Sequence, residues 1–481
     1  MRSEWVRDRI YIDGEWASAH GAERQVEDPA TESTAGRFRQ ASAEDAATAI
    51  EAASRAAEAW AATTPQQRSA LLTALHTALV ERSDLLVETL VAELGTPVSL
   101  ARSSHLGQAL EVLHSYAEMV KSYPFVENLR NSRVVSESAG VVGAITPWNY
   151  PLYQLVAKVV PALAAGCTVV AKPADLTPLS AFVFTDALHS VGFPPGVFNL
   201  VPGPGAEVGE VLSTHPDVSV ISFTGSTEVG KRVGASAAAS IKRVCLELGG
   251  KSASIVLHDA NIAEAVTATV ENVMVNSGQT CTAWTRLLVP REELDSALRV
   301  AQSAALAVTV GDPKDENTDM GPVASATQRE SVLGYIRDAV ADGATLVTGG
   351  VERPDGLTVG HFVRPTILTG MAPTARIVQE EVFGPVLVIL PYDNEDEAIA
   401  LANGTPYGLA GAVWGADTEH AFAVANRLRT GRVDINGAPW NAIAPFGGYG
   451  LSGNGRELGR WGLEEFLETK SIQMPTAEHN S

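Results

Sequence analysis

Apolar runs rich in Val and Ile alternate with Ala-rich stretches of helical periodicity through most of the chain. The sequence SAEDAATAIEAASRAAEAW at 42–60 predicts a helix that starts with an approximate capping box, because Asp45 follows Ser42 by three residues. The helical stretch after it is predicted to stop at Gly95. This alternation of strand-like and helical segments is typical of parallel α/β units.

From Ala139 onward the strand and helix patterns alternate at short intervals. The strand-like segments are GVVGAIT, CTVVAKP, VFNLV and VSVISF, and the helical stretches between them include one near 206–213. A further strand, SASIVLH, follows a Gly-Gly pair. The pattern predicts an α/β fold, and because no internal repeat or low-complexity linker is present, domain boundaries are inferred from changes of pattern.

Composition narrows the class of protein. The 481 residues suggest about three structural units, and a hydrophobic content of 45% supplies material for their cores. Acidic residues outnumber basic ones by 56 to 35, and the resulting net charge of −21 repels nucleic acid and anionic lipid headgroups. We therefore expect a metabolic protein with a small-molecule partner, and neither a nucleic-acid nor a membrane partner.

The number of cysteines and the length of the apolar runs indicate the cellular compartment of the protein. Three cysteines in so long a chain imply no disulfide framework and fit a reducing compartment. The N-terminal sequence MRSEWVRDRI has no apolar core of a signal peptide. The longest apolar run, at 159–171, contains a proline and falls short of the roughly 18 residues of a membrane span. We expect a cytoplasmic protein.

One cysteine lies in an unusual setting, VMVNSGQTCTAW at 273–284. The residues before it predict a helix that breaks at Gly278, so that Cys281 lies just past its end. A lone cysteine is more often a small buried hydrophobe than a nucleophile, but a loop of small polar residues offers the access and backbone donors that a reactive thiolate needs. Cys167 and Cys245 lie in apolar strand-like runs, which favours structural roles.

Two further polar residues each have two interpretations. Glu247 in CLELGGKS, placed between a strand and two glycines, is either a partnered structural acid or a general base whose pKa burial would raise. Asn149 in ITPWNYP either serves the turn or donates its amide to a developing oxyanion. The sequence contains no HExxH, CxxC or GxSxG motif, so we expect no metal and set aside metalloenzymes and serine hydrolases.

Two glycine-rich stretches are candidate cofactor sites, and each is a weak signal alone. VPGPGAEVG resembles the dinucleotide-binding fingerprint but is one residue too long between its later glycines. FTGSTEVG places Ser226 where a helix begins after a strand, so that backbone N–H groups can face a phosphate.

Together the motifs resemble one family, the NAD(P)-dependent aldehyde dehydrogenases. The resemblance runs through YIDGEW, EDPAT, TPWNYP, AGCTVVAKPAD, FTGSTEVG, LELGGKS, NSGQTC and EEVFGPV to PFGGYGLSGNGRE at 445–457. It implies a Rossmann-like cofactor-binding domain, an α/β catalytic domain and a small β oligomerisation element, in a homodimer or homotetramer. The implied ranges are 1–117 and 137–249 for the cofactor domain, 250–450 for the catalytic domain, and 118–136 and 451–481 for the oligomerisation element.

The resemblance assigns the chemistry residue by residue. Cys281 matches the nucleophile that attacks the aldehyde, while Asn149 and the Cys281 backbone N–H match the groups that hold the oxyanion. Hydride transfer to NAD leaves a thioester, which Glu247 hydrolyses by activating water, and Lys158 matches a lysine that assists proton movement. The expected product is a carboxylic acid. The alternatives are a coenzyme A-acylating semialdehyde dehydrogenase, which typically lacks the glutamate base, and a catalytically silent cofactor-binding protein.

The resemblance also identifies the cofactor site, with FTGSTEVG preferred for the pyrophosphate. Ser226 is expected to bond phosphate, Gly205 to lie beside the adenine, and Glu381 to hold the nicotinamide ribose next to Phe383. The other implied cofactor-binding residues are Ile145, Pro147, Trp148, Lys172, Asp175, Phe223, Gly225 and Leu248.

Two positions depart from the family pattern. Asp175 stands where NAD-preferring members usually have a glutamate that bonds both ribose hydroxyls, and although it reaches less far, its charge would repel a 2′-phosphate. NAD is therefore the expected cofactor, with NADP as the alternative. Gly450 replaces a lysine common in relatives, and we assign it no function.

The identity of the aldehyde is the least defined feature. No arginine stands among the matching tunnel positions, so a neutral aromatic or medium aliphatic aldehyde is favoured over a succinate-type semialdehyde. The implied substrate residues are Tyr153, Gln154, Ala157, Thr280, Thr282, Trp440 and Phe446.

Overall fold

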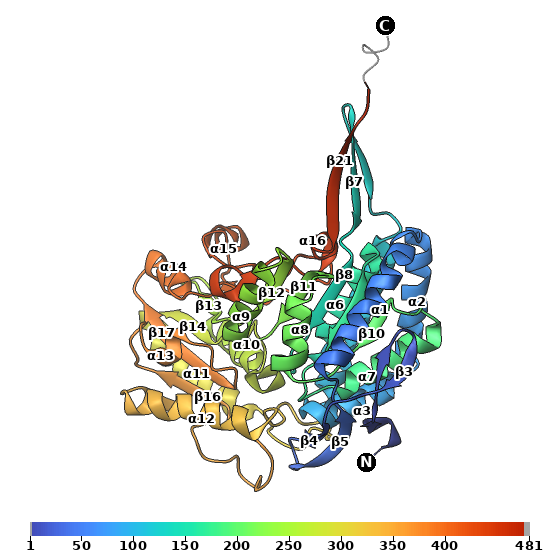
Figure 1. Cartoon of the computed structure of the whole chain (residues 1–481). Coiled ribbons are helices and arrows are strands. Elements are labelled where there is room, and N and C mark those ends of the chain that lie inside the picture. The colour runs from blue at the N-terminus through green and yellow to red at the C-terminus, as the bar shows by residue number, and fades with distance from the viewer. Residues whose placement is uncertain (1, 476–481) are drawn as a thin grey trace.

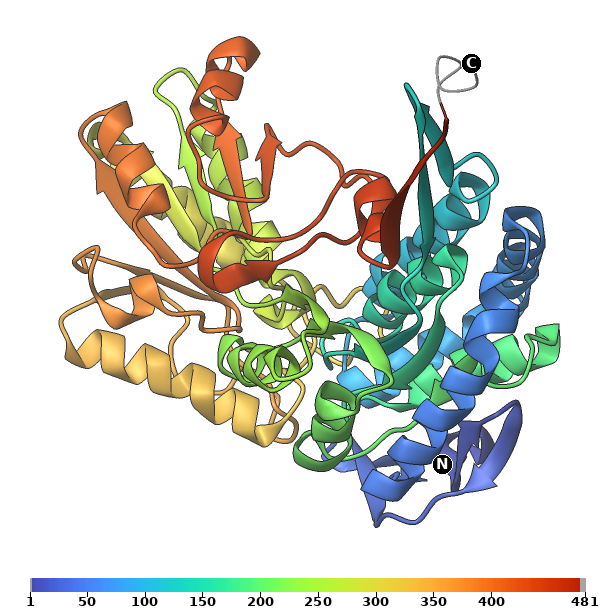
Figure 2. The same ribbon diagram turned by 45° about the horizontal axis from the view of Figure 1, so that its top comes forward.

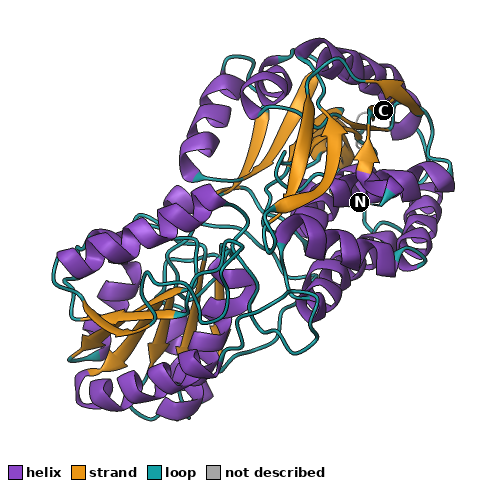
Figure 3. Ribbon diagram, turned by 90° about the horizontal axis from the view of Figure 1, so that it is seen from below, coloured by secondary structure: helices purple, strands orange, loops and turns teal. Residues whose placement is uncertain are grey.

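A computed structural model describes residues 2–475 and consists of two α/β lobes with a narrow projecting arm (Figure 1). The view from below separates the lobes most clearly, each with its own sheet between helices (Figure 3). None of the helices in the described residues is both long and apolar enough to cross a bilayer.

The first lobe is built on an eight-stranded sheet whose five central strands are parallel. Its edge strands β20, β2 and β3 join it in antiparallel pairing. In spatial order the strands are β20 (Gly453–Asn454), β12 (Arg243–Glu247), β11 (Val218–Thr224), β8 (Val141–Ile145), β9 (Thr168–Lys172), β10 (Phe198–Leu200), β2 (Arg9–Ile12) and β3 (Glu15–Ser18).

The helices of this lobe begin and end largely where the sequence predicts. Ser42 and Asp45 form a reciprocal capping box at the first helix, and Gly95 ends the third in a left-handed conformation at φ 77°. The helices are α1 (Ala43–Ala61), α2 (Pro65–Val80), α3 (Ser83–Leu94), α4 (Val98–Leu100), α5 (Gly107–Met119), α6 (Pro151–Ala165), α7 (Leu179–Val191), α8 (Glu210–Thr214) and α9 (Thr227–Ala238), with π-helical turns at Ala101–Leu106 and Gly205–Gly209.

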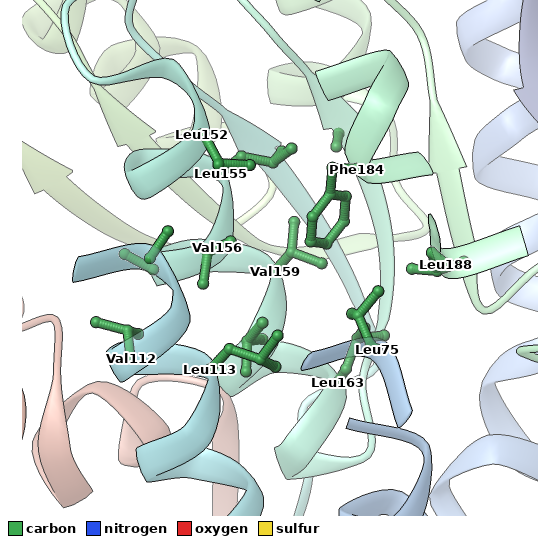
Figure 4. Packing of buried hydrophobic residues seen from close by; sticks show 14 of the residues in the cluster. Leu75, Val112, Leu113, Leu152, Leu155, Val156, Val159, Leu163, Phe184 and Leu188 are labelled. Carbon is green, nitrogen blue, oxygen red and sulfur yellow. The ribbon is translucent and has the colours of Figure 1, made fainter. Parts of the chain in front are cut away.

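Helix α6 is the centre of the largest hydrophobic core. All of its side chains are buried, as expected for a helix that is apolar around its whole circumference. Figure 4 shows its residues Leu155, Val159 and Leu163 packed against Leu113 of α5 and Phe184 of α7. Because this helix carries Tyr153, Gln154, Ala157 and Lys158, its packing fixes where those side chains can reach.

The second lobe contains a seven-stranded sheet that is parallel except at β15. In spatial order its strands are β15 (Thr345–Thr348), β16 (Thr366–Thr369), β17 (Val386–Tyr392), β14 (Arg286–Pro290), β13 (Ala253–Val256), β18 (Ala410–Trp414) and β19 (Arg432–Ile435). The later helices of the chain are α10 (Ile262–Met274), α11 (Leu294–Ala307), α12 (Ala326–Ala341), α13 (Arg376–Gln379), α14 (Glu395–Asn403), α15 (Thr418–Ala425) and α16 (Gly459–Glu464).

Two smaller sheets complete the structure. One joins β1 (Val6–Arg7), β5 (Ser33–Arg39) and β4 (Glu23–Asp28) near the N-terminus. The other forms the arm from β6 (Val126–Leu129), β7 (Ser132–Ser138) and β21 (Leu467–Gln473), so that segments far apart in sequence lie side by side (Figures 1 and 2). Before α16, β20 lies antiparallel to β12 and extends the large sheet at its edge.

The loop between α9 and β12 contains a strained residue. Ile241 has a φ of 55° and is 92% exposed. A β-branched side chain in the left-handed region carries a conformational cost of about 1–3 kcal/mol, and here no packing compensates for it. We predict that Ile241→Asn raises the thermal unfolding midpoint by about 1–2 °C, because asparagine tolerates this conformation.

Differential scanning fluorimetry checks this prediction. Val359→Asn is the matched control, since Val359 is also β-branched and half exposed but does not have a positive φ. An unchanged or lower midpoint for Ile241→Asn would show that the left-handed turn is not a source of strain.

Candidate active site

The segment that carries Cys281 differs from its sequence prediction. The helix was expected to break at Gly278, but α10 ends at Met274, and Asn276, Ser277 and Gly278 follow with φ values of 52°, 57° and 73°. The reason is a long-range contact: a Cβ at position 278 would lie 2.0 Å from the backbone carbon and oxygen of Gly384. The chain therefore turns left-handed against another loop before it reaches the cysteine.

Asn149, which belongs to the first lobe, is hydrogen-bonded to this turn of the second lobe. The Asn276 side-chain amide donates to the Asn149 carbonyl oxygen at 2.9 Å, and the Asn149 Nδ2 donates to the Gln279 carbonyl oxygen at 2.9 Å. Asn149 is buried, and only one of its two amide hydrogens is used in this bond. The arrangement holds an amide donor beside the Cys281 segment.

Cys281 is a free cysteine and is half-buried. Burial raises its pKa to about 12, and the negative charges of Glu381, Glu247 and Glu457 add to that effect, while its own backbone N–H opposes it. By contrast, Cys167 and Cys245 are fully enclosed, in agreement with the structural roles predicted for them. Of the three cysteines, Cys281 is the one whose side chain is partly exposed to solvent, and charged carboxylates lie near it.

Glu247 ends strand β12 and is almost completely buried, and neither of its carboxylate oxygens is hydrogen-bonded to any of the residues 2–475. Its pKa is raised well above the ordinary range, first by burial and then by the charge of Glu457, against the opposing effect of Lys158. The Lys158 ammonium forms a buried ion pair with Glu457 and donates to the Ser222 hydroxyl at 3.4 Å. These groups form a buried acid–base cluster in the first lobe.

Between the lobes lies a cavity of about 210 Å³ that brings many of the predicted residues together. Glu381 accepts a bond from the Gly250 N–H at 2.9 Å, and Trp148 packs edge-on to Phe383 at 5.3 Å. The lining residues are Pro147, Trp148, Asn149, Thr224, Gly225, Ser226, Leu248, Gly249, Cys281, Gln328, Glu381 and Phe383.

The N-terminus of α9 opens onto this cavity. Ser226 is its N-cap and accepts from the Val229 N–H at 3.4 Å, as the FTGSTEVG motif predicts. Backbone donors and the helix dipole make such a terminus suitable for a phosphate. Gly230 lies so close to Leu248 that a Cβ there would be 2.4 Å from the leucine side chain, which fixes the helix on the sheet.

The other predicted cofactor residues are outside the cavity lining. Asp175 accepts from the Gln40 Nε2 at 2.6 Å, and its second oxygen is buried without a partner. The Lys172 ammonium donates to the Pro173 carbonyl oxygen at 2.9 Å, and a Cβ at Gly205 would meet no atom within 4 Å. Ile145 and Phe223 are buried core residues at the ends of β8 and β11.

The predicted substrate residues fall into two groups. Tyr153 packs edge-on to Trp440 at 6.1 Å, and Thr280 is hydrogen-bonded to the Tyr150 hydroxyl at 2.9 Å, beside half-buried Thr282. Gln154, Ala157 and Phe446 are buried, and Gln154 accepts from the Thr224 hydroxyl at 3.3 Å. None of these predicted substrate residues lines the cavity above.

The structure adds residues that the sequence analysis did not identify. Glu457 pairs with Lys158, and Gln328 donates to the Phe383 carbonyl oxygen at 2.8 Å while lining the cavity. Glu457 lies inside the quoted motif PFGGYGLSGNGRE, so an acid in that motif was the available signal. Gln328, in the first turn of α12, carried no comparable signal.

Comparisons with known proteins agree with this geometry. The model of the aldehyde dehydrogenase family matches residues 16–472. The chain is 47% identical to 3-succinoylsemialdehyde-pyridine dehydrogenase of a Pseudomonas species, over 96% of this chain and 98% of that protein. A crystal structure of a Cys-to-Ala variant of aldehyde dehydrogenase C from Pseudomonas syringae, in complex with NAD+ and octanal, has a TM-score of 0.97 and 43% identity, covering 98% of this chain and 97% of that one. An aldehyde dehydrogenase of Mycobacterium tuberculosis complexed with NAD+ has a TM-score of 0.96 and 40% identity, covering 98% and 99%.

The electrostatics of the cavity predict how the thiol reacts. Burial raises the pKa of Glu381 to about 7, so this carboxylate is charged at pH 8–9 and disfavours a thiolate at Cys281. We predict that Glu381→Gln accelerates alkylation of Cys281 by iodoacetamide about threefold or more at pH 8.5, and that the difference fades below pH 7, where Glu381 becomes protonated.

Peptide mapping by mass spectrometry follows alkylation at Cys281 in protein freed of cofactor. Glu380→Gln is the control, because Glu380 is exposed and bonded to Tyr335 and Arg376. Equal rates for Glu381→Gln and the unaltered protein at pH 8.5 would contradict the assigned coupling.

Proposed function

The chain belongs to the aldehyde dehydrogenase family, and we propose that it oxidises an aldehyde to a carboxylic acid with NAD by a hydrolytic mechanism in which Cys281 is the nucleophile. The observation that carries this proposal is the combination of an accessible thiol with a buried glutamate, Glu247, that has no hydrogen-bond partner. Burying a carboxylate without a hydrogen-bond partner costs free energy, and groups perturbed in this way cluster at functional sites.

The first half of the reaction uses the thiol and the amide of Asn149. The Cys281 thiol transfers its proton to solvent water, and the resulting thiolate attacks the aldehyde carbon and places negative charge on the former carbonyl oxygen. The remaining amide hydrogen of Asn149 and the Cys281 backbone N–H are the donors available to that oxyanion.

The cavity residues fit a dinucleotide. The α9 terminus with Ser226 provides phosphate donors. Asp175 lies outside the cavity lining, and its assignment to the adenosine ribose rests on the family resemblance and on an oxygen that has no partner among the described residues. Glu381 provides a carboxylate in the cavity lining. NAD, when bound there, supplies the hydride acceptor that converts the thiohemiacetal into a thioester. The relatives whose structures contain NAD+ support this assignment.

Hydrolysis of the thioester is assigned to Glu247. Burial raises its pKa, which makes the carboxylate, once ionised, a stronger base toward water than an exposed glutamate. Glu457 and Lys158 lie close enough to shift the pKa of Glu247, and they form an ion pair with each other. We therefore propose that these two groups carry the proton away from Glu247. The same glutamate argues against release of the thioester to coenzyme A.

The aldehyde is proposed to be neutral and either aromatic or of medium aliphatic length. Tyr150, Tyr153 and Trp440 form a continuous set of edge-to-face contacts close to the nucleophile segment, a surface suited to apolar groups. The charge of Arg432 influences Tyr153, but its guanidinium is already bonded to Asp434. Two relatives support this proposal: one is named for a pyridine semialdehyde, which is aromatic, and the other was crystallised with octanal, which is aliphatic.

We also propose the three-part division of the chain and a homodimer or homotetramer in the cytoplasm. The arm supports the assembly, because within the described part of the chain its outer strand β21 pairs on one edge only. Val126, Leu129 and Ile472 on the surface of the arm are about half exposed. An exposed strand edge with apolar side chains is a ready template for pairing with another chain.

The assignment of Glu247 predicts a kinetic signature. Glu247→Gln retains the shape of the side chain but loses its basicity, so steady-state turnover should fall about 100-fold or more. Hydride transfer precedes hydrolysis, so rapid mixing should still give a burst of NADH of about one equivalent per active site.

Cys281→Ala serves as the matched control and should show neither burst nor turnover. Normal turnover in Glu247→Gln would exclude this residue as the base, and loss of the burst together with turnover would assign it to thiol activation instead.

The preference for NAD rests on Asp175. Its carboxylate is expected to repel a 2′-phosphate, so kcat/KM with NAD should exceed that with NADP. Asp175→Asn keeps the size of the side chain and removes its charge, and should reduce the NAD/NADP ratio about tenfold. Steady-state kinetics with both cofactors measure it. A ratio near one in the unaltered protein would mean that Asp175 does not face the ribose.

A further inference from the structure

A buried histidine lies beneath the nucleophile segment. His105 belongs to the π-helical turn Ala101–Leu106 that precedes α5, and its side chain is fully buried. Its ring stacks on the ring of Tyr150, with centroids 4.3 Å apart and planes inclined by 15°. Such turns within helices are frequent at functional sites because they redirect one side chain out of the regular helical pattern.

Tyr150 connects this histidine to the nucleophile. The hydroxyl groups of Tyr150 and Thr280 are hydrogen-bonded at 2.9 Å, and Thr280 immediately precedes Cys281. Tyr150 also begins helix α6 as its N-cap residue, one position after Asn149. A displacement of the tyrosine ring would therefore act on both the thiol segment and the amide donor.

The histidine is uncharged in this position. Burial lowers the pKa of His105 to about 3, and the Asn276 side chain opposes that shift only partly. The His105 Nε2 is within 3.3 Å of the Thr96 hydroxyl, while its Nδ1 has no hydrogen-bond partner among the residues that the structure describes. A neutral ring can stack closely on Tyr150 without bringing a charge next to the thiol.

The nucleophile segment needs such external support. Asn276 and Ser277 occupy left-handed conformations that non-glycine residues rarely adopt, and such conformations persist only where the surroundings hold them. Asn276 lies next to His105 and bonds to Asn149, and Thr280 is bonded to Tyr150. The histidine thus stacks on Tyr150, the residue that holds the Thr280 end of the strained turn.

We propose that His105 is a positioning residue, which holds Tyr150 and the 276–281 turn in the arrangement that presents the Cys281 thiol to the aldehyde. It acts through the stacked ring and touches no reacting atom. The inference rests on the proposed role of Cys281 as nucleophile.

Three variants separate the parts of this arrangement. His105→Ala removes the stack, His105→Phe keeps an aromatic ring but removes the ring nitrogens, and Tyr150→Phe keeps the stack but removes the hydroxyl bonded to Thr280. We expect kcat to fall about tenfold or more in His105→Ala and about threefold or more in Tyr150→Phe, with KM changed less than about threefold. His105→Phe should retain kcat within about twofold.

Hydrogen–deuterium exchange of the substrate-free protein gives a readout that does not need activity. Peptides covering 275–281 should exchange faster in His105→Ala and Tyr150→Phe than in the unaltered protein. His76→Ala is the matched control, because His76 also packs against another ring, that of His114, but does not line the cavity. It should leave both kcat and exchange of 275–281 unchanged.

The outcomes distinguish the two levels of the proposal. If Cys281→Ala is inactive while His105→Ala and Tyr150→Phe show normal kcat and normal exchange, the positioning role is overturned and the proposed function stands. If Cys281→Ala keeps its activity, the proposed function itself fails. If His105→Ala does not fold, His105→Leu, which keeps apolar bulk but removes the stacked ring, takes its place, and normal kcat with normal exchange of 275–281 in that variant overturns the positioning role.

Discussion

The close approach of two backbone segments, at Gly278 and Gly384, is the constraint on which the site depends. A side chain at position 278 would overlap the backbone of Gly384, so the turn can pass only because it is glycine there. This contact joins the segment after α10 to the loop that carries Glu381 and Phe383. This packing contact therefore fixes the segment that carries Cys281 against the loop that carries Glu381.

A second constraint is the shared burial of acidic groups. Glu247, Glu457 and Glu381 all raise the pKa of Cys281, and among these acids Glu457 alone is paired with a lysine. Burying charged groups in a medium of low dielectric constant costs free energy. Because these groups also interact with one another, a proton gained or lost at one of them changes the pKa of the others. A Cβ at Gly447 would lie 2.7 Å from a Glu247 oxygen, which shows how tightly the carboxylate is enclosed. The chemistry proposed for the site uses this coupling.

Local sequence signals predicted much of the fold. The capping box at Ser42 and the left-handed stop at Gly95 depend on neighbouring residues, and the α/β class follows from periodicity. The end of α10 was misplaced because the contact with Gly384 comes from more than 100 residues away. Glu457 was missed for the same reason, since only folding brings it to Lys158. The domain ranges and the roles of the predicted site residues remain predictions.

The central claim is that Cys281 carries the acyl group during turnover, and acid quenching tests it most directly. The unaltered protein is mixed with NAD and an aldehyde substrate, quenched within the first turnover, digested and analysed by mass spectrometry. The mechanism predicts one acyl group, on the peptide that contains Cys281, in an amount that matches the NADH formed. NADH formation with the acyl group on another residue, or with no covalent adduct at any quench time, would contradict it.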